Sequence, residues 1–418
     1  MKHIIYYIAL ACVVACATEK KSDKKASPEA ESAIDGTFTG ACPHLFTSGD
    51  TAAVFSWVRI LSDSEAVLCF KLSDGNNFGK TITVPGSEKV KPHGENLSKV
   101  ILVPGGRTPD GRTPNGRIIA AWGVANPNPQ NKYSGLVIYS SSADGGITWT
   151  KPVAISPAEN SIDQRYFDLE ILPDGTVGAV WLDSRKNTKH EGSSLYFATF
   201  GQNNTFEGEK AIDETVCQCC RTDLFVDKTG GLHVAYRKIL NDSIRDMVHI
   251  ASLDNGKSFS APARISPDNW VIAACPHTGP AITQTDSALS FVWYTMGTGR
   301  GVFFASSTDN GKTFSPRNAV GNSTAGKHPQ IQLLKNGNQA IVWDEHTENG
   351  SLIGLEVRSP KGEKLKTAHL ASNAGFATFP VVKLVNDELL IAYSGSRTAE
   401  DKERVYFQRV NMGKFMGK

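Results

Sequence analysis

The chain has almost no charge imbalance and no long apolar run at its N-terminus. Its 44 Lys and Arg residues nearly match its 42 Asp and Glu residues, and the net charge of +2 gives no electrostatic basis for binding nucleic acid. The apolar run at residues 4–14 is too short to cross a bilayer and has the length of a signal-peptide core. The C-x-x-C-H sequence of haem attachment and the cysteine spacing of a zinc ribbon are also missing, and we expect no cofactor.

The apolar run ends in Val13-Val14-Ala15-Cys16, which resembles the lipobox of bacterial lipoproteins. That resemblance implies a signal peptide at residues 1–15 and acylation of Cys16; an ordinary secretory signal is the alternative. Ala17 resembles the sorting residue of lipoproteins sent to an outer membrane. Residues 16–40 would then be the lipidated cysteine and a charged tether. We expect a lipid-anchored monomer in the cell envelope, on the periplasmic or the outer face of that membrane.

One eight-residue pattern, S-x-D-x-G-x-[ST]-[WF], occurs three times. The copies lie at residues 142–149, 252–259 and 307–314, each between apolar alternating runs, which is typical of a hairpin turn. An Asp at the third position accepts hydrogen bonds from N–H groups of its own turn, and the Gly permits a positive φ. We expect the final aromatic ring to fold back onto the neighbouring strands.

The pattern resembles the Asp-box of the sialidase superfamily, whose members are β-propellers. That resemblance implies an all-β fold in which the boxes lie on the face away from the ligand site. It is much weaker evidence for activity, because one fold supports many functions.

A second repeat sets the number of propeller blades. An apolar strand ending in an aromatic residue recurs every 50 to 65 residues, the spacing of blades built from four antiparallel strands. The seven aromatic residues are Trp57, Trp122, Trp181, Tyr236, Trp293, Trp343 and Tyr393. We therefore predict one propeller domain at residues 41–418 with seven blades; six blades and an N-terminal appendage are the alternative.

Two further observations support seven blades. Ala-Cys-Pro-His occurs at residues 41–44 and again at 274–277, which indicates the same position in two blades and makes residues 41–85 a full blade. The last blade lacks a fourth strand at the C-terminus, and residues near 37–39 are expected to supply it.

Arginines gather where strands begin and end on the face opposite the boxes. Arg221 and Arg237 start and end one hairpin, and with Arg165 or Arg185 from the preceding blade they would suit a carboxylate. We therefore expect the protein to bind a glycan or another anionic ligand over the central channel. Arg245, His277 and His328 reach the same face. The alternative is that each arginine pairs with a nearby acid, as Arg185 would with Asp183.

Catalysis has weaker support than binding. The resemblance implies a tyrosine nucleophile and an Arg-Ile-Pro motif, but the chain has no such motif before the first blade and reads Thr378-Phe379-Pro380 where the tyrosine is expected. Phenylalanine cannot attack an anomeric carbon. An exo-acting glycoside hydrolase of sialidase type remains the alternative function, with Asp183, Asp344 and Glu345 as its acids.

Cysteines are the most unusual feature. Cys217, Cys219 and Cys220 precede the fourth blade and Cys275 the fifth, so we expect them to lie near one another, with a disulfide from Cys275 to one of the three. A metal site using these thiolates with His277 or His44 is the alternative. Trp270, in the same region, is either a platform for a sugar ring or a lid packed over the cysteine loop.

Overall fold

The computed structural model describes residues 32–33, 39–49, 52–73, 77–105, 116–128, 133–186, 189–201, 203–348, 350–373, 375–398 and 400–417. The expected signal peptide and Cys16 lie outside these residues. Within them, no helix has both the length and the apolar character needed to span a membrane.

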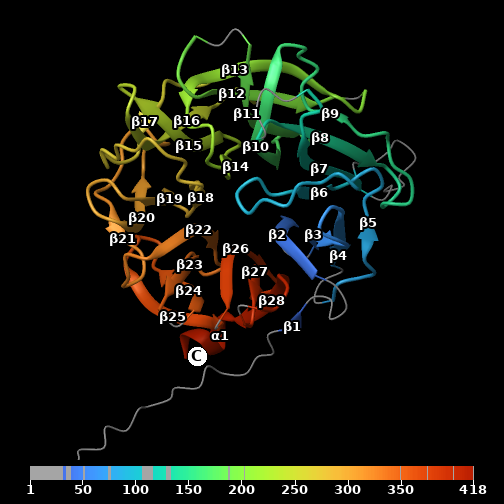
Figure 1. Ribbon diagram of the computed structural model, residues 1–418. Helices are drawn as coiled ribbons and strands as arrows, with labels where there is room; N and C mark the ends of the chain where they lie inside the picture. The colour runs from blue at the N-terminus through green and yellow to red at the C-terminus, as the bar shows by residue number, and fades with distance from the viewer. Residues whose placement is uncertain are drawn as a thin grey trace, which may run out of the picture.

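The described residues form antiparallel sheets arranged around a central axis (Figure 1). The first sheet contains β2 (Thr39–Ser48), β3 (Ala52–Ile60), β4 (Ala66–Leu72) and β5 (Ile82–Thr83), and the second contains β6 (Lys99–Val103), β7 (Arg117–Ala125), β8 (Gly135–Ser142) and β9 (Val153–Ala154). Next come β18 (Ala281–Gln284), β19 (Leu289–Thr295), β20 (Gly301–Ser307) and β21 (Asn318–Ala319), then β22 (Gly326–Leu333), β23 (Gln339–Thr347), β24 (Gly350–Arg358) and β25 (Lys364–Asn373).

An eight-stranded sheet lies between the second and third of these. It contains β10 (Ser161–Ile171), β11 (Val177–Arg185), β12 (Ser193–Phe200), β13 (Phe206–Val216), β14 (Asp223–Val226), β15 (Leu232–Leu240), β16 (Ile244–Ser252) and β17 (Ala263–Arg264). Only the pairing of Val216 with Lys238 joins β13 to β15.

The last sheet closes the ring with strands from both ends of the chain. It contains β26 (Phe376–Val385), β27 (Glu388–Ser396), β28 (Arg404–Asn411) and β1 (Ser32–Ala33), and α1 (Met412–Met416) follows it. The expectation of a closing strand from the N-terminal region is correct, but its position is wrong, because Ser32 and Ala33 pair with β28 while Thr39 already begins β2.

Strand pairing corrects the interpretation of the two Ala-Cys-Pro-His copies. Leu45 lies opposite Phe55 on β3, and Ile282 lies opposite the corresponding Phe291 on β19. His44 therefore lies one residue before the residue opposite the first-blade phenylalanine, whereas His277 lies five residues before the residue opposite the corresponding phenylalanine of β19. The two copies do not occupy the same position, although β2–β5 still form one complete sheet.

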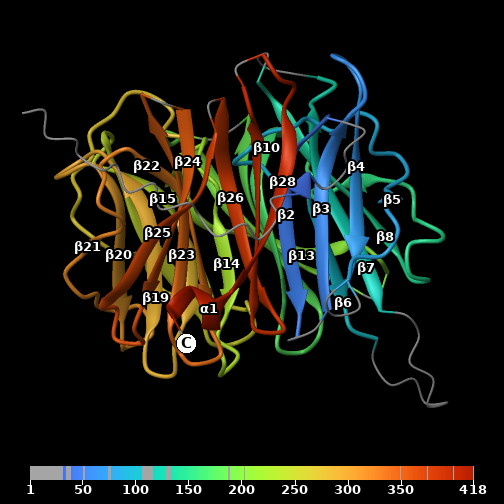
Figure 2. The ribbon, with the colours of Figure 1, turned by 90° about the horizontal axis from the view of Figure 1, so that it is seen from below.

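Aromatic residues of the second strands fill the spaces between sheets. Trp122, Trp181, Trp293 and Trp343 are fully buried. Burying such a side chain contributes roughly 1.5–3 kcal/mol. The strands run roughly parallel to the central axis, so that one face of the ring carries the starts of the first strands (Figure 2).

The Asp-box turns have the predicted structure. In the first box, Asp144 accepts hydrogen bonds from the N–H groups of Ile147 and Thr148 at 3.0 and 2.9 Å, and Ser142 donates to it at 2.8 Å. Hydrogen bonds, from Thr148 above all, lower the pKa of Asp144 to about 2. The ring of Trp149 packs edge-on against Phe70 of the preceding sheet, with 6.0 Å between centroids. This box thus links two sheets.

Candidate functional site at the channel mouth

Strained residues mark the starts of the first strands. A bulge in β2, β10, β22 and β26 encloses Cys42, Tyr166, His328 and Phe379 respectively, with φ angles of 48–56°. His277, just before β18, has φ 49°. A non-glycine residue in this left-handed region costs roughly 1–2 kcal/mol, and such strain concentrates at functional sites. The bulges direct attention to the face where the first strands begin.

One loop, residues 91–98, crosses this face and reaches the centre of the ring (Figure 1). Glu95 anchors it: one carboxylate oxygen accepts from Arg221 Nη1 at 2.6 Å and the other from the Gly279 N–H at 2.7 Å. Asn96 Oδ1 accepts from the Tyr166 N–H at 2.6 Å. Gly94 lies so close to Phe379 that an added Cβ would be 2.3 Å from its ring. The loop therefore covers the central channel.

An imidazole and phenol cluster lies beside the loop. Tyr166 Oη is 3.5 Å from His277 Nδ1, and the ring of His93 lies 5.6 Å from Tyr166 and 5.7 Å from His277 between centroids. Burial raises the pKa of Tyr166; burial and His277 lower the pKa of His93, which keeps that imidazole neutral at pH 7. His277 is exposed and His93 half-buried, so both offer nitrogen atoms to a ligand.

His328 and Phe379 form the opposite side of the mouth. Their rings lie 4.1 Å apart between centroids. Asp344 Oδ2 accepts from His328 Nδ1 and Thr378 Oγ1, both at 2.6 Å, and from the Phe379 N–H at 2.7 Å. Burial opposes protonation of His328, but the Asp344 carboxylate outweighs it and raises the pKa of His328.

Beneath the loop the channel is narrow and charged. A cavity of about 90 Å³ is lined by His44, Lys99, Asp168, Glu170, Asp223 and Lys383, among others. Lys99 Nζ and Asp168 Oδ1 form an ion pair at 2.7 Å. Burial raises the pKa of Glu170 to about 7 and that of Asp223 to about 6, while burial and Lys99 lower the pKa of His44 far below its usual value. His44 thus lies in the channel, away from the cysteines.

The predicted arginines bind protein groups. Arg165 pairs with Asp163, Arg185 with Asp183 and Glu209, Arg221 with Glu95, and Arg245 with Glu191. Arg237 donates to the carbonyls of Arg245, Thr278 and Tyr294. Arg221 and Arg237 donate to neighbouring carbonyl groups, those of Gly279 and Thr278, so both arginines contact the same loop before β18. Four of these arginines pair with an acid, as the alternative predicted, and Arg237 binds backbone carbonyls instead.

The three candidate acids also have internal partners. Asp183 accepts from Ser161 Oγ at 2.7 Å and from Arg185, and burial raises its pKa. Glu345 is 8% exposed and accepts from Trp343 Nε1 at 3.2 Å. Of the three, Asp344 lies at the mouth, where it holds His328.

Trp270 is part of the core. It is 5% exposed, its ring packs against Tyr294 at 5.7 Å, and the Arg237 guanidinium lies 4.8 Å from its centroid. The indole therefore has no free face for a sugar ring, and the prediction of a sugar platform is wrong.

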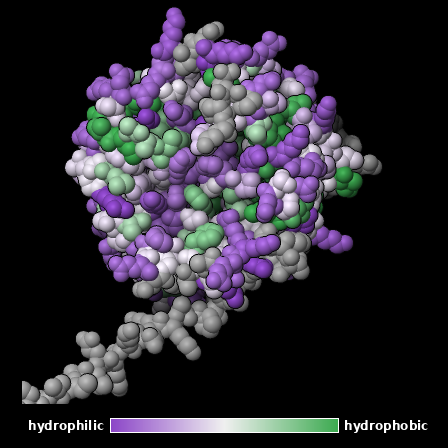
Figure 3. Space-filling model, in the orientation of Figure 1, coloured by the Kyte–Doolittle hydropathy of each residue, from purple (hydrophilic) through white to green (hydrophobic). Residues whose placement is uncertain are grey.

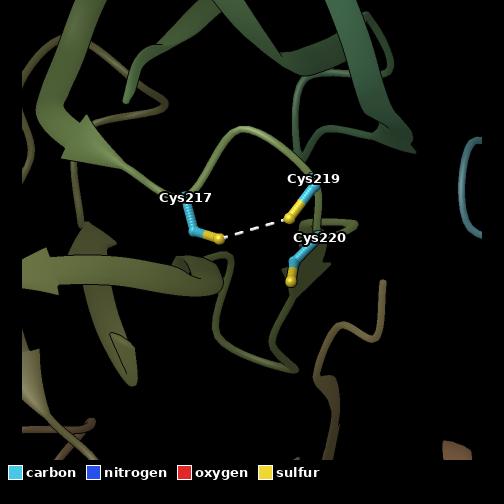
Figure 4. Close-up of side chains that lie close together, drawn as sticks. All are labelled: Cys217, Cys219 and Cys220. Atoms are coloured by element: carbon cyan, nitrogen blue, oxygen red, sulfur yellow. Dashed lines mark hydrogen bonds between the residues drawn. The ribbon is translucent and has the colours of Figure 1, made fainter. Parts of the chain in front are cut away.

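Three of the cysteines meet in the loop between β13 and β14. Cys217, Cys219 and Cys220 are buried, and their sulfur atoms all lie within 4.8 Å of one another (Figure 4). Cys275 is exposed and is not part of this group, nor are His277 and His44. The six cysteines in the described part of the chain are unbridged in this structure.

The face seen in Figure 3 is mainly hydrophilic around its centre, with small apolar areas between polar side chains. Sequence reasoning found His277, His328 and Phe379 but missed His93, Glu95 and Tyr166. The run His93-Gly94-Glu95-Asn96 could have indicated this loop. A glycine among polar residues permits the backbone to pack closely against a side chain, here the ring of Phe379.

Comparison with known proteins supports the fold. No protein-family model matches the chain, and no curated protein matches it in sequence. Among solved structures, polysaccharide lyase Uly1 is 12% identical with a TM-score of 0.54, covering 95% of this chain and 94% of that one. A protein of unknown function from Dyadobacter fermentans DSM 18053 is 15% identical with a TM-score of 0.51, covering 90% and 95%. The NanB sialidase from Streptococcus pneumoniae is 12% identical with a TM-score of 0.48, covering 92% and 70%. The chain has a sialidase-like β-propeller fold, and identities this low show the fold alone.

Proposed function

We propose that the protein binds an acidic glycan on the channel mouth. The observation that carries this proposal is the convergence of strained residues there: Tyr166, His277, His328 and Phe379 all adopt positive φ angles. This strain lies at the starts of the first strands, where His277 is exposed, His328 and Phe379 are half-buried, and Tyr166 is buried beside His277.

The chemistry of the mouth suits a sugar with anionic groups. Phe379 and His328 offer two half-buried rings, tilted by 38° with centroids 4.1 Å apart, and aromatic faces pack well on sugar rings. Exposed His277 and half-buried His93 offer hydrogen-bonding nitrogens. Arg165, with a side chain 22% exposed, and exposed Lys327 place positive charge at the rim. The fold shared with Uly1, a polysaccharide lyase, is compatible with a glycan ligand.

Binding to a panel of sialylated, uronate-containing and neutral glycans tests this proposal. We expect affinity for one of the acidic classes, weakened at least tenfold by His277→Ala and by Phe379→Ala. The matched control is His369→Ala, because His369 is exposed on the outer strand β25, away from the mouth. Equal weakening by all three variants, or no binding to any glycan, would contradict the proposal.

A second candidate is proton abstraction from an acidic polysaccharide, which would make the protein a lyase. It rests on the 3.5 Å contact between Tyr166 Oη and His277 Nδ1 and on the Arg165 guanidinium, 5.5 Å from the Tyr166 ring. Such a pair can act as general base and acid, and the arginine can neutralise a carboxylate. Tyr166→Phe should abolish formation of unsaturated sugar products while glycan affinity is retained. Covalent hydrolysis of sialidase type is not part of the proposal, because Phe379 is not a nucleophile.

We also propose that Cys16 carries a lipid anchor and that the protein resides in the outer membrane. The lipobox-like sequence Val13-Val14-Ala15-Cys16 supports this. Labelling with radioactive palmitate should mark the wild type and not Cys16→Ala. An unlabelled wild type recovered from the soluble fraction would contradict it.

Seven blades are the architecture that we propose. The eight-stranded sheet is then two blades, β10–β13 and β14–β17, whose strands are paired through a single residue pair, and every other sheet in the described part of the chain has four strands. A crystal structure with six repeats about the axis would contradict this count.

A further inference from the structure

The cysteine group in the loop between β13 and β14 is compact and closed off from solvent. Cys217, Cys219 and Cys220 are 0, 2 and 2% exposed, and Cys217 Sγ lies 3.5 Å from Cys219 Sγ. The three sulfur atoms come from four consecutive residues, and Figure 4 shows those of Cys217 and Cys219 turned toward each other with that of Cys220 beside them. Three sulfur atoms within 4.8 Å of one another leave room for one shared ion.

Two arginines adjoin this group: half-buried Arg245, and buried Arg237, whose carbonyl oxygen accepts from the Cys217 N–H at 2.9 Å. Arg245 Nη1 donates to Cys217 Sγ at 3.4 Å, and its other nitrogens bind the Ile272 carbonyl and Glu191. Arg237 is 1% exposed, donates only to backbone carbonyls in the described bonds, and has a buried Nε without a partner. A buried cation paired only with neutral carbonyls is costly unless an anion lies nearby.

The number and type of ligands select the ion. Structural zinc sites have four protein ligands. Within the described part of the chain, no fourth His, Cys, Asp or Glu joins the three cysteines. Soft thiolate ligands favour monovalent copper.

We propose that Cys217, Cys219 and Cys220 together bind one Cu(I) ion in a three-sulfur site. Three Cu–S bonds form as three S–H bonds release their protons to solvent, and no electron is transferred. The resulting cluster carries two negative charges. The Arg245 guanidinium that donates to Cys217 is shared with Glu191, whereas Arg237 has no acidic partner in the described bonds.

The wild-type protein tests the proposal directly. The full chain is reduced, kept free of oxygen and titrated with Cu(I) against a chromophoric Cu(I) chelator. We expect one tightly bound equivalent, and an X-ray absorption spectrum with about three sulfur neighbours and no nitrogen or oxygen shell. A Cu(I) spectrum dominated by nitrogen, or retention of less than half an equivalent, would overturn the proposal. So would an internal disulfide among the three cysteines that resists reduction in the folded protein.

Single substitutions locate the site. Cys220→Ser should weaken Cu(I) binding at least a hundredfold. Cys69→Ser is the matched control, because Cys69 is equally buried on β4, where it contacts Thr83. Cys275→Ser, at an exposed position, should also bind like the wild type. Unchanged affinity in Cys220→Ser, with the melting temperature confirming a folded protein, would exclude this site; loss of affinity in the Cys69 control alone would assign copper elsewhere.

Discussion

Glu170 shows how the channel controls a single carboxyl group. It lines the cavity under loop 91–98 near Asp168, Asp223 and Lys383. Burial raises its pKa to about 7, more than Lys383 lowers it. The folded protein therefore holds this proton more tightly than the unfolded chain does. The contribution to stability is complete below pH 4.5 and is lost as the pH rises through 7.

Replacing Glu170 by Gln should abolish this pH dependence. We expect Glu170→Gln to be more stable than the wild type at pH 8, by roughly 1–3 kcal/mol, because no buried carboxylate has to ionise. At pH 4 the two proteins should have nearly equal free energies of unfolding. Denaturant unfolding at both pH values measures this, with the exposed Glu159→Gln as control. A stability difference that is the same at both pH values would refute the pKa assignment.

At the scale of elements, the loop at residues 91–98 is held by contacts with several sheets. Glu95 binds Arg221 and Gly279, and Gly94 faces Phe379. Arg221 lies in the loop before β14, Gly279 lies in the loop before β18, and Phe379 lies in β26. The loop's position thus depends on sheets that are far apart in the sequence.

The contact between Gly94 and Phe379 gives a test of this loop. An added Cβ would lie 2.3 Å from the ring, so Gly94→Ala should destabilise the protein by roughly 1–3 kcal/mol. In a Phe379→Ala background the same change should cost much less, because the clash is gone. A double-mutant cycle from chemical unfolding measures the coupling. Additive effects would show that the loop does not pack on Phe379.

The Asp-box turn is the second element whose contribution to the free energy of unfolding should depend on pH. Asp144 is half-buried, and its hydrogen bonds with Thr148, Ser142 and Ile147 lower its pKa to about 2. Its stabilising effect is present above its ordinary pKa of 3.8 and is lost as the pH falls through 2.

Asp144→Ala should therefore lower the melting temperature by a few degrees at pH 7. The difference from wild type should shrink toward pH 2, where the wild-type carboxyl is partly protonated. Asp63→Ala, at an exposed position in the turn between β3 and β4, should leave the melting temperature unchanged. A pH-independent difference would argue against the hydrogen-bonded carboxylate as its cause.

For the whole molecule, ring closure is the decisive feature. β1 pairs with β28 through Ser32–Phe407 and Ala33–Tyr406. Without β1, β28 would present unpaired N–H and C=O groups, and exposed strand edges promote association.

Truncation tests this closure. Removal of residues 1–36 should lower the melting temperature and cause concentration-dependent self-association, whereas removal of residues 1–31 retains β1 and should do neither. Calorimetry and sedimentation at several concentrations measure both effects. Identical behaviour of the two truncations would show that β1 does not close the ring.

The sequence by itself determined the all-β fold, the Asp-box turns and the buried aromatic ends, because these depend on local periodicity and turn chemistry. The position of the closing strand and the equivalence of the two Ala-Cys-Pro-His copies were predicted wrongly. Both depend on the register between strands, which is set by pairing with a distant segment and which a four-residue motif does not record.

The tertiary structure alone decided the site. Arg221 finds its carboxylate in Glu95, 126 residues away, and Trp270 is buried against Arg237. Such partners are selected by packing and desolvation between sheets, which no local pattern records. The same packing brought His93 and Tyr166 to His277 and placed Arg245 against the sulfur atom of Cys217, contacts between residues far apart in the chain.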